Sequence, residues 1–345
     1  MREFAVRKLT ERTLAILEIG LAAILCLTAT GAAAGTTHAS NNPMYGLAGT
    51  YALSNARDLQ DLADHHFDLA RLGGVPLPAL ARPLGIYEVN SDIGSLLYSQ
   101  CLRYWRKSTA CDPAVQDREN DAIAKRLKMI GANKNIVAFW VLDDNPGYDI
   151  RPELRTVHDL IQAQNAKDGA NRPMICGFGG ILDLVVDGKL RGYAVDFDAA
   201  LKNYDARACD MVALYPYAVY GPNYNPKADP SIVDWSMSQL LPEMKAKLRA
   251  LGWDEGTAPL IGVPQAFGGA NPDLSGHGFV TPSASDVTTQ TVAYCRGGAV
   301  ALLAETSGYA PAAPQMTLFN TDSLMTGYQN GVNTCRNRFW SKAAH

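Results

Sequence analysis

Residues 136–146 have the sequence IVAFWVLDDNP, in which an apolar run from Ile136 to Leu142 precedes the carboxylates Asp143 and Asp144. An apolar run of this length is typical of a strand that is buried on both faces of a parallel sheet. Other strand-length stretches alternate with amphipathic stretches along the chain and bring the total to eight: residues 44–49, 67–72, 84–89, 174–178, 211–215, 260–263 and 298–304. This alternation predicts an α/β fold, a single (β/α)8 TIM barrel.

The stretches between these strands predict the crossover helices. In residues 117–130, for example, Ile123, Leu127 and Ile130 recur on one helical face. Helices are also expected at 55–65, from Pro152 onward, and at 238–251, 286–296 and 322–340. Residues 91–113 are expected to form an insertion. Since no linker or repeat interrupts the chain, residues 40–345 are predicted to form one domain.

A doubly wound open sheet is the alternative to the barrel. It usually carries a G-x-G-x-x-G motif after its first strand, and this chain has neither that motif nor a P-loop. No cofactor is therefore expected. The adjacent His65 and His66 lack the spacing of zinc ligands, and no Cys-x-x-Cys occurs, so no metal site is expected either.

The first residues have the layout of a secretory signal peptide. Basic residues at positions 2, 7, 8 and 12 precede an apolar run at 19–27, and small residues follow. Glu18 makes the run shorter than the roughly 20 apolar residues of a spanning helix. We expect residues 1–39 to be a signal peptide and the protein to be secreted or placed in the cell envelope. Membrane association is expected only if this leader is retained.

The charge balance argues against a nucleic-acid partner. The chain has 31 Lys and Arg against 34 Asp and Glu, a net charge of −3, whereas proteins that bind phosphate backbones concentrate positive charge.

Six cysteines follow the predicted leader, and an even number in an exported chain favours disulfides. The simplest pairing by sequence separation joins Cys101 to Cys111, Cys176 to Cys209 and Cys295 to Cys335.

In a barrel of this kind, the chemistry is assembled at the C-terminal ends of the strands. The residues that follow or end the predicted strands combine carboxylates, amides and aromatic rings: Tyr51, Arg71, Glu88, Asp143, Asp144, Asn145, Phe178, Tyr215, Tyr217, Gln265, Phe267 and Glu305. Such a set suits a sugar, because rings stack on its apolar face while carboxylates and amides bond its hydroxyls. Tyrosine and tryptophan are also ordinary residues of a barrel rim.

Residues 136–146 resemble the fourth-strand segment of glycoside-hydrolase-type barrels, in which an apolar strand ends in an acidic pair and a proline. Residues 172–174 resemble the lead into the fifth strand of these barrels, 210–217 their sixth strand and 262–268 their seventh. The resemblance spans residues 136–305. It implies a (β/α)8 barrel that hydrolyses the O-glycosidic bonds of an oligo- or polysaccharide with carboxylate acid/base catalysis.

The chain departs from these barrels at two positions. Retaining members place an acid/base glutamate after strand four and a nucleophilic glutamate after strand seven. This chain has Asp143, Asp144 and Asn145 at the first place, and at the second it has Gln265, whose amide cannot act as a nucleophile.

The enzymatic interpretation therefore assigns Asp144 as the general acid, with Glu305 or Glu88 as the second carboxylate. If Trp140 and Leu142 face one way, Asp144 shares that face with them. A substrate-assisted route is a further possibility, in which the adjacent Asp143 orients an N-acetyl group and so replaces the missing nucleophile. The residues expected to bind substrate are Glu88, Asn145, Trp140, Tyr215, Tyr217, Gln265 and Phe267.

Two interpretations compete with an enzyme. A carbohydrate-binding barrel without turnover is favoured by Asn145 and Gln265, and a structural envelope protein would lack an aromatic-lined pocket.

The cysteine pattern gives the first testable prediction. Cys101 and Cys111 should form a disulfide, whose loop closure contributes about 2 to 4 kcal/mol to the free energy of unfolding. Peptide mapping without reductant should find the two peptides linked, and mapping after reduction should find them separate. Free thiols at both positions in the untreated protein would contradict the pairing.

Overall fold

The computed structural model confirms the (β/α)8 barrel and excludes the open sheet. It describes residues 42–51, 53, 55–73, 77–100, 112–143, 149–181, 185–186, 189–190, 200–217, 232–269, 280–306 and 315–340. Eight parallel strands close in the order β1-β11-β9-β8-β5-β4-β3-β2. Their bounds are β1 Ala48–Thr50, β2 Leu69–Leu72, β3 Tyr87–Asn90, β4 Ile136–Leu142, β5 Met174–Ile181, β8 Met211–Tyr217, β9 Leu260–Gly262 and β11 Ala301–Ala304.

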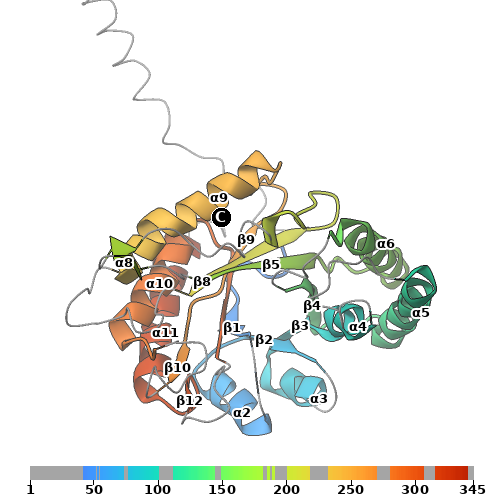
Figure 1. Ribbon diagram of the computed structural model, residues 1–345. Coiled ribbons are helices and arrows are strands. Elements are labelled where there is room, and N and C mark those ends of the chain that lie inside the picture. Colours follow the sequence, from blue (N-terminus) through green and yellow to red (C-terminus); the bar gives the residue numbers. More distant parts are fainter. Residues whose placement is uncertain are drawn as a thin grey trace, which may run out of the picture. The chain divides into compact units, whose positions relative to one another are not determined.

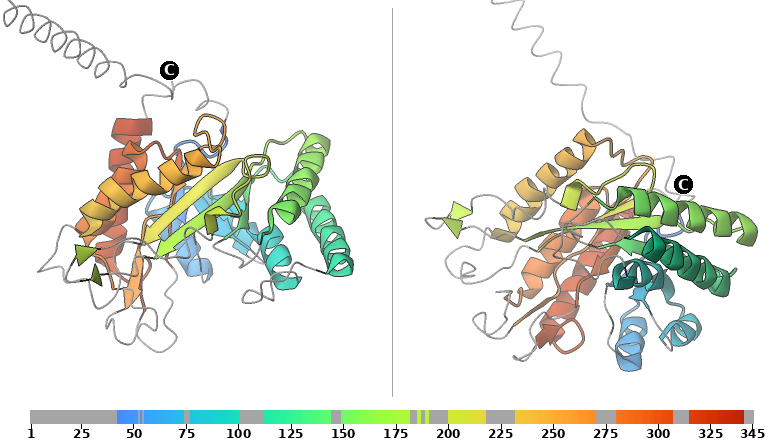
Figure 2. Two further views of the ribbon diagram at one scale, coloured as in Figure 1. Left: turned by 45° about the horizontal axis from the view of Figure 1, so that its top comes forward. Right: turned by 45° about the vertical axis from the view of Figure 1, so that its right-hand side comes forward.

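The helices surround the strands in sequence order (Figure 1). Their bounds are α2 Ala56–Asp64, α3 Leu77–Ala81, α4 Asp92–Gln100, α5 Pro113–Ile130, α6 Arg151–Asp168, α8 Ile232–Trp235, α9 Leu241–Ala250, α10 Ala284–Arg296 and α11 Asp322–Cys335. In Figure 2, α10 and α11 lie on the opposite side of the barrel from α5 and α6. Within the described ranges, every helix is too short or too polar to span a lipid bilayer.

Shorter elements complete the described part of the chain. They are the 3-10 turn η2 Arg82–Leu84, the π-helical segments η4 Ser236–Leu240 and η6 Arg336–Trp340, and the two-stranded pairs β6 Val185–Val186 with β7 Lys189–Leu190 and β10 Phe267–Gly269 with β12 Gln315–Thr317.

Some element ends differ from the sequence-based expectation because local turns and caps decide them. β3 begins at Tyr87 instead of residue 84, because η2 ends in a turn at Gly85, whose φ of 73° favours glycine. α5 begins at Pro113 instead of residue 117, because the Asp112 carboxylate accepts a hydrogen bond from the Ala114 amide at 2.8 Å. The expected insertion at 91–113 contains α4, which belongs to the crossover from β3 to β4.

Residues of the barrel strands fill two separate layers, and in β8 they alternate strictly between the two. In β8, Tyr215 and Tyr217 lie in the inner cluster that fills the barrel, together with Met211 and Ala213. Val212 and Leu214 lie in the outer cluster that packs beneath the helices. The barrel is therefore a packed core, as parallel barrels of this size require.

The barrel closes where β1 lies between β11 and β2. A Cβ atom on Gly49 would lie only 1.4 Å from the main-chain oxygen of Leu69, so this close approach requires glycine. From α11, the Tyr328 hydroxyl donates to the Gly49 oxygen at 2.7 Å and fixes the helix over the closure.

Two of the three expected disulfides are present. Cys176 in β5 pairs with Cys209 just before β8, and Cys295 in α10 pairs with Cys335 at the end of α11. Cys101 and Cys111 lie outside the described residues, so their pairing stays a prediction.

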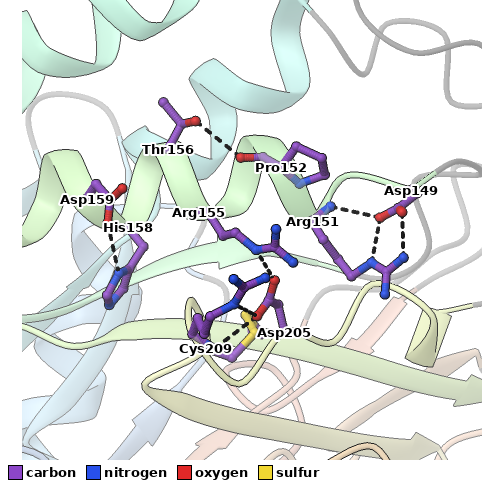
Figure 3. A network of polar contacts seen from close by, with 11 residues as sticks. Asp149, Arg151, Pro152, Arg155, Thr156, His158, Asp159, Asp205 and Cys209 are labelled. Atoms are coloured by element: carbon purple, nitrogen blue, oxygen red, sulfur yellow. Dashed lines mark hydrogen bonds and ion pairs between the residues drawn. A yellow bond between two sulfur atoms is a disulfide. The ribbon is translucent and has the colours of Figure 1, made fainter.

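A polar network holds the chain that leads into β8 against α6 (Figure 3). Arg155 of α6 forms an ion pair with Asp205, close to Cys209. The other oxygen of Asp205 accepts a hydrogen bond from the Arg207 amide at 3.0 Å. The Ile150 amide, at the start of α6, donates to the Asn203 side chain at 3.0 Å.

Arg172, just before β5, has a structural role. It is buried and bonds the side chains of Asn165 and Asp168 at the end of α6. It also donates to the main-chain oxygen of Gly131 at 2.7 Å, beyond the end of α5. One guanidinium thus holds the ends of two neighbouring helices.

Glu88 does not face the barrel interior, contrary to its expected role in binding substrate. It pairs in register with Ala70 of the outer cluster, whereas Val89 lies in the inner cluster. The Glu88 carboxylate is fully buried and accepts a hydrogen bond from Asn90 at 2.7 Å, and its other oxygen has no partner among the described residues. Burial raises its pKa from 4.5 to about 7; the charge of Asp92 adds to this rise, and the charge of Arg126 opposes it.

This carboxylate gives the second testable prediction. Because the folded state favours the protonated acid, the free energy of unfolding should fall as the pH rises from about 4.5 to about 7 and stay lower above that range. In Glu88→Gln the amide replaces the acid and removes this loss. The variant should exceed the wild type in stability by about 1 to 3 kcal/mol at pH 8 and by little at pH 4, as measured by urea unfolding.

Glu243→Gln is the matched control, because Glu243 lies exposed on α9. An equal difference between Glu88→Gln and wild type at both pH values would contradict the prediction.

Candidate active site at the C-terminal ends of the strands

Five polar and aromatic residues from five strands converge at the C-terminal mouth of the barrel. Tyr51 follows β1, Arg71 belongs to β2, Asp143 follows β4, Tyr215 lies in β8 and Glu305 follows β11. The parallel strands bring these ends to one face, where such barrels carry their active sites. We call this group the mouth cluster.

The Asp143 carboxylate is the acceptor at the centre of the mouth cluster. The Tyr215 hydroxyl donates to its Oδ1 at 2.8 Å. The Tyr51 hydroxyl and the Arg71 guanidinium both donate to its Oδ2, the latter at 3.3 Å. Three donors from three different strands thus fix the orientation of this carboxylate.

Arg71 is held against aromatic rings as well as against a carboxylate. Its guanidinium carbon lies 4.0 Å from the ring centroid of Tyr51 and 5.4 Å from that of Trp140, within the range of cation–π attraction. The carboxylate of Glu305 also interacts electrostatically with Arg71. Arg71 therefore interacts with two carboxylates that come from different strands.

Tyr51 is a hydrogen-bond donor in this site. Burial, followed by the negative charge of Asp143, raises the pKa of Tyr51 well above its ordinary value of 10. The hydroxyl stays protonated at neutral pH, so it suits donation to Asp143 and does not suit nucleophilic attack.

A row of aromatic rings crosses the mouth. Tyr51 packs edge-on against Trp140 with ring centroids 4.8 Å apart, Tyr215 and Tyr217 are 5.6 Å apart, and Tyr217 packs edge-on against Phe267 at 5.2 Å. All five rings are buried, so they form the floor of the site. The indole Nε1 of Trp140 has no acceptor among the described residues.

Gly177 in β5 makes room for these rings. A Cβ atom at this position would lie 2.6 Å from Trp140 and 3.0 Å from Tyr215. The sequence singles out no role for this glycine, because only the packing across the barrel reveals the close approach.

Gln265 and Glu305 lie next to each other on adjacent strand ends, where they form a parallel bridge. Both side chains are buried. The amide nitrogen of Gln265 donates to the main-chain oxygens of Phe267 and Val280 at 3.2 and 3.3 Å. Gln265 thus supports the chain that follows β9, and its expected contact with substrate stays a prediction.

The strand alternation assumed for the acidic pair is wrong. Trp140 lies in the inner cluster and Leu142 in the outer one, because the register of β4 against β5 shifts between these two residues. After this irregularity it is Asp143 that reaches the mouth cluster. Asp144 and Asn145 lie outside the described residues, and their roles stay predictions.

The structure therefore brings together most of the expected site residues: Asp143, Glu305, Trp140, Tyr215, Tyr217, Gln265 and Phe267. It adds Tyr51 and Arg71, which the sequence places at strand ends without a role. In the described part of the chain, no three His, Cys, Asp or Glu side chains are grouped so that they could hold a metal ion.

Comparisons with known proteins give no match by sequence: no protein-family model and no curated protein matches the chain. Solved structures do match the fold. One, described as a glycoside hydrolase, has a TM-score of 0.50 at 11% identity, over 88% of this chain and 72% of that chain.

Two further matches are enzymes that act on glycosides. An exo-beta-1,4-mannosidase from Opitutaceae bacterium strain TAV5 has a TM-score of 0.48 at 13% identity, over 91% of this chain and 63% of its own. A beta-galactosidase from the psychrophilic Marinomonas ef1 has a TM-score of 0.49 at 7% identity, over 84% of this chain and 59% of its own. The chain thus spans less than two thirds of the length of these two proteins.

At such identities a structural likeness shows the fold alone. The activities in the names of these proteins describe those proteins and not this chain. The chain has the (β/α)8 barrel fold found in solved glycoside hydrolases.

Proposed function

We propose that this protein is an exported glycoside hydrolase that cleaves O-glycosidic bonds of an oligo- or polysaccharide at the mouth cluster. One observation carries the proposal. Asp143, which follows β4, accepts hydrogen bonds from Tyr51 and Arg71, and Glu305, which follows β11, interacts electrostatically with the same two residues. These strands stand four places apart in the closed order of eight, and so on opposite sides of the barrel. Most glycoside hydrolases use two carboxylates that flank the scissile glycosidic bond.

Glu305 is proposed as the base or nucleophile. It is fully buried, and the positive charge of Arg71 stabilises a negative charge on it. Asp143 is proposed to orient the site, because both its oxygens already accept hydrogen bonds from fixed donors. Asp144, its neighbour in sequence, is proposed as the general acid that protonates the glycosidic oxygen.

The sugar is proposed to lie on the aromatic floor. Tyr215, Tyr217 and Phe267 are proposed to form the apolar base over which a sugar ring lies, and Asn145 and Gln265 are proposed to bond its hydroxyls. The buried Nε1 of Trp140 supports a bound ligand in particular, because a sugar oxygen would supply the acceptor that it lacks among the described residues.

A carbohydrate-binding barrel without turnover is the second candidate. The three donors on Asp143 and the amide at Gln265 favour it, since neither residue then offers a free acid for catalysis. The same glycan would bind in both cases, and turnover separates the two.

Export is proposed from the two disulfides as well as from the leader. Disulfides persist in oxidising compartments. Residues 1–39 are proposed as the cleaved signal peptide and 40–345 as the barrel domain.

Substitution of the proposed catalytic carboxylates gives the third testable prediction. Asp144→Asn and Glu305→Gln should each lower the rate of hydrolysis by at least about 100-fold, because each removes a group that transfers a proton or attacks in the transition state. Binding of the intact glycan should weaken much less. Release of reducing sugar from a panel of oligosaccharides measures the rate, and calorimetry measures the binding.

Glu88→Gln serves as the matched control, since it removes a buried carboxylate on the outer face of β3. It should keep the activity of the wild type. Hydrolysis that survives in both Asp144→Asn and Glu305→Gln would refute the assignment, and binding without hydrolysis by the wild type would establish the second candidate.

A further inference from the structure

We propose that His158 and Asp210 form a pH-sensitive clamp, which fastens α6 to the starts of β5 and β8 more tightly in mildly acidic than in alkaline solution. This clamp lies at the N-terminal ends of the strands, opposite the mouth, so the inference goes beyond the proposed function and does not depend on it. It follows from a comparison of two carboxylates that the fold uses in the same way.

Each of these two carboxylates directly precedes a barrel strand and bonds the first amide of the neighbouring strand. Asp68 precedes β2, and its Oδ1 accepts a hydrogen bond at 2.8 Å from the amide of Ala48, where β1 begins. Asp210 precedes β8, and its Oδ2 accepts one at 2.9 Å from the amide of Met174, where β5 begins. In the closed order β5 stands four places from β1, and β8 four places from β2. The same arrangement therefore occurs on opposite sides of the barrel.

Each carboxylate also pairs with a basic side chain from a helical element outside the strands. Arg336 of η6 lies 2.7 Å from Oδ2 of Asp68, and Nε2 of His158 in α6 lies 3.1 Å from Oδ1 of Asp210. We call these groups the Asp68 clamp and the Asp210 clamp. The side chains of Asp68 and Asp210 are equally open to solvent, with exposures of 33% and 32%. The basic partner is thus the main difference between the two clamps.

The two basic partners respond differently to pH. Arginine keeps its charge throughout the range in which proteins stay folded, whereas histidine loses its charge near neutral pH. The hydrogen bond to Asp210 raises the pKa of His158 above its ordinary value of 6.5; burial opposes this rise, and the charges of Asp210 and Asp159 add to it. The stabilisation is therefore complete below about pH 6.5 and is lost as the pH rises through the raised pKa.

Among the described residues, Asp210 is the principal charged partner of His158. Asp159, the next residue of α6, lies 3.8 Å from Nδ1 of His158 (Figure 3), but its side chain is 85% exposed and contributes little. A cavity of about 380 Å³ adjoins His158 and Asp210. Its other polar side chains are uncharged: Asn42, Gln162, Asn171 and Thr257.

The test measures hydrogen exchange of the Met174 and Ala48 amides in the full chain, resolved to single amides by mass spectrometry. Protection factors, which correct for the intrinsic effect of pH on exchange, are determined at pH 5.5 and 8.5. The ratio of Met174 protection to Ala48 protection cancels changes in global stability that both amides share. We expect this ratio to fall by at least about threefold between pH 5.5 and 8.5, the size expected of a partly exposed ion pair.

Variants assign the change to His158. In His158→Gln the side chain is neutral at every pH, so the ratio at pH 5.5 should drop to about the wild-type value at pH 8.5 and then stay constant. In His158→Arg the charge persists, and the adjoining cavity gives room for the longer side chain, so the ratio should stay high at both pH values. Asp159→Asn is the matched control and should keep the wild-type fall.

The outcomes are decisive without a glycan. A wild-type ratio that is the same at both pH values would overturn the inference, whether or not the variants fold. A ratio that still falls in both His158→Gln and His158→Arg would overturn the assignment to this histidine. Failure of the proposed function in the hydrolysis and binding assays leaves this result unaffected, because the exchange of these amides is measured in the free protein.

Discussion

Closure of the barrel is the constraint on which the site depends, because it compels each strand to send alternate residues into a narrow interior. In β2 this places Arg71 above Leu69, and in β8 it stacks Tyr215 and Tyr217 above Met211 and Ala213. The lumen is filled by apolar side chains, so polar groups gather only where the strands end. The chemistry of the mouth is thus a product of the same alternation that builds the core.

The architecture could be predicted from the sequence because the strands of a parallel barrel are buried on both faces. Apolar runs such as 136–142 are visible without any structure, and so is the alternation with amphipathic helices. The two described disulfides were predictable for a similar reason: cysteines near the ends of neighbouring elements have few partners within reach.

The orientation of single side chains could not be predicted in the same way. The register shift after Trp140 leaves no trace in the sequence, and it decides that Asp143 reaches the interior. For Glu88 the error runs the other way, because a residue expected at the mouth lies outside it. The sequence places Glu88 near the end of a predicted strand, where a side chain can face either the barrel interior or the helices. Only its pairing with Ala70 of the outer cluster shows that Glu88 faces the helices. Tyr51 and Arg71 gain their importance from partners that are distant in sequence.

The polar groups of the mouth are arranged by depth. Arg71 and Asp143 are partly exposed, with side-chain exposures of 21% and 25%, whereas Glu305 is fully buried. Glu305 is therefore less accessible to solvent than the Arg71–Asp143 ion pair. Burial of Glu305 in a region of low dielectric strengthens its charge interactions.

The Cys176–Cys209 bond has a consequence for how this barrel can change over evolution. It joins two points 33 residues apart and closes the chain between β5 and β8 into a covalent ring. Arg155 and Asp205 fasten the returning end of that ring to α6. Residues gained or lost inside the ring alter its circumference, while the bond keeps the start of β5 and the start of β8 at a fixed spacing. The bond thus separates a segment that is free to vary in length from the strands that must remain in register.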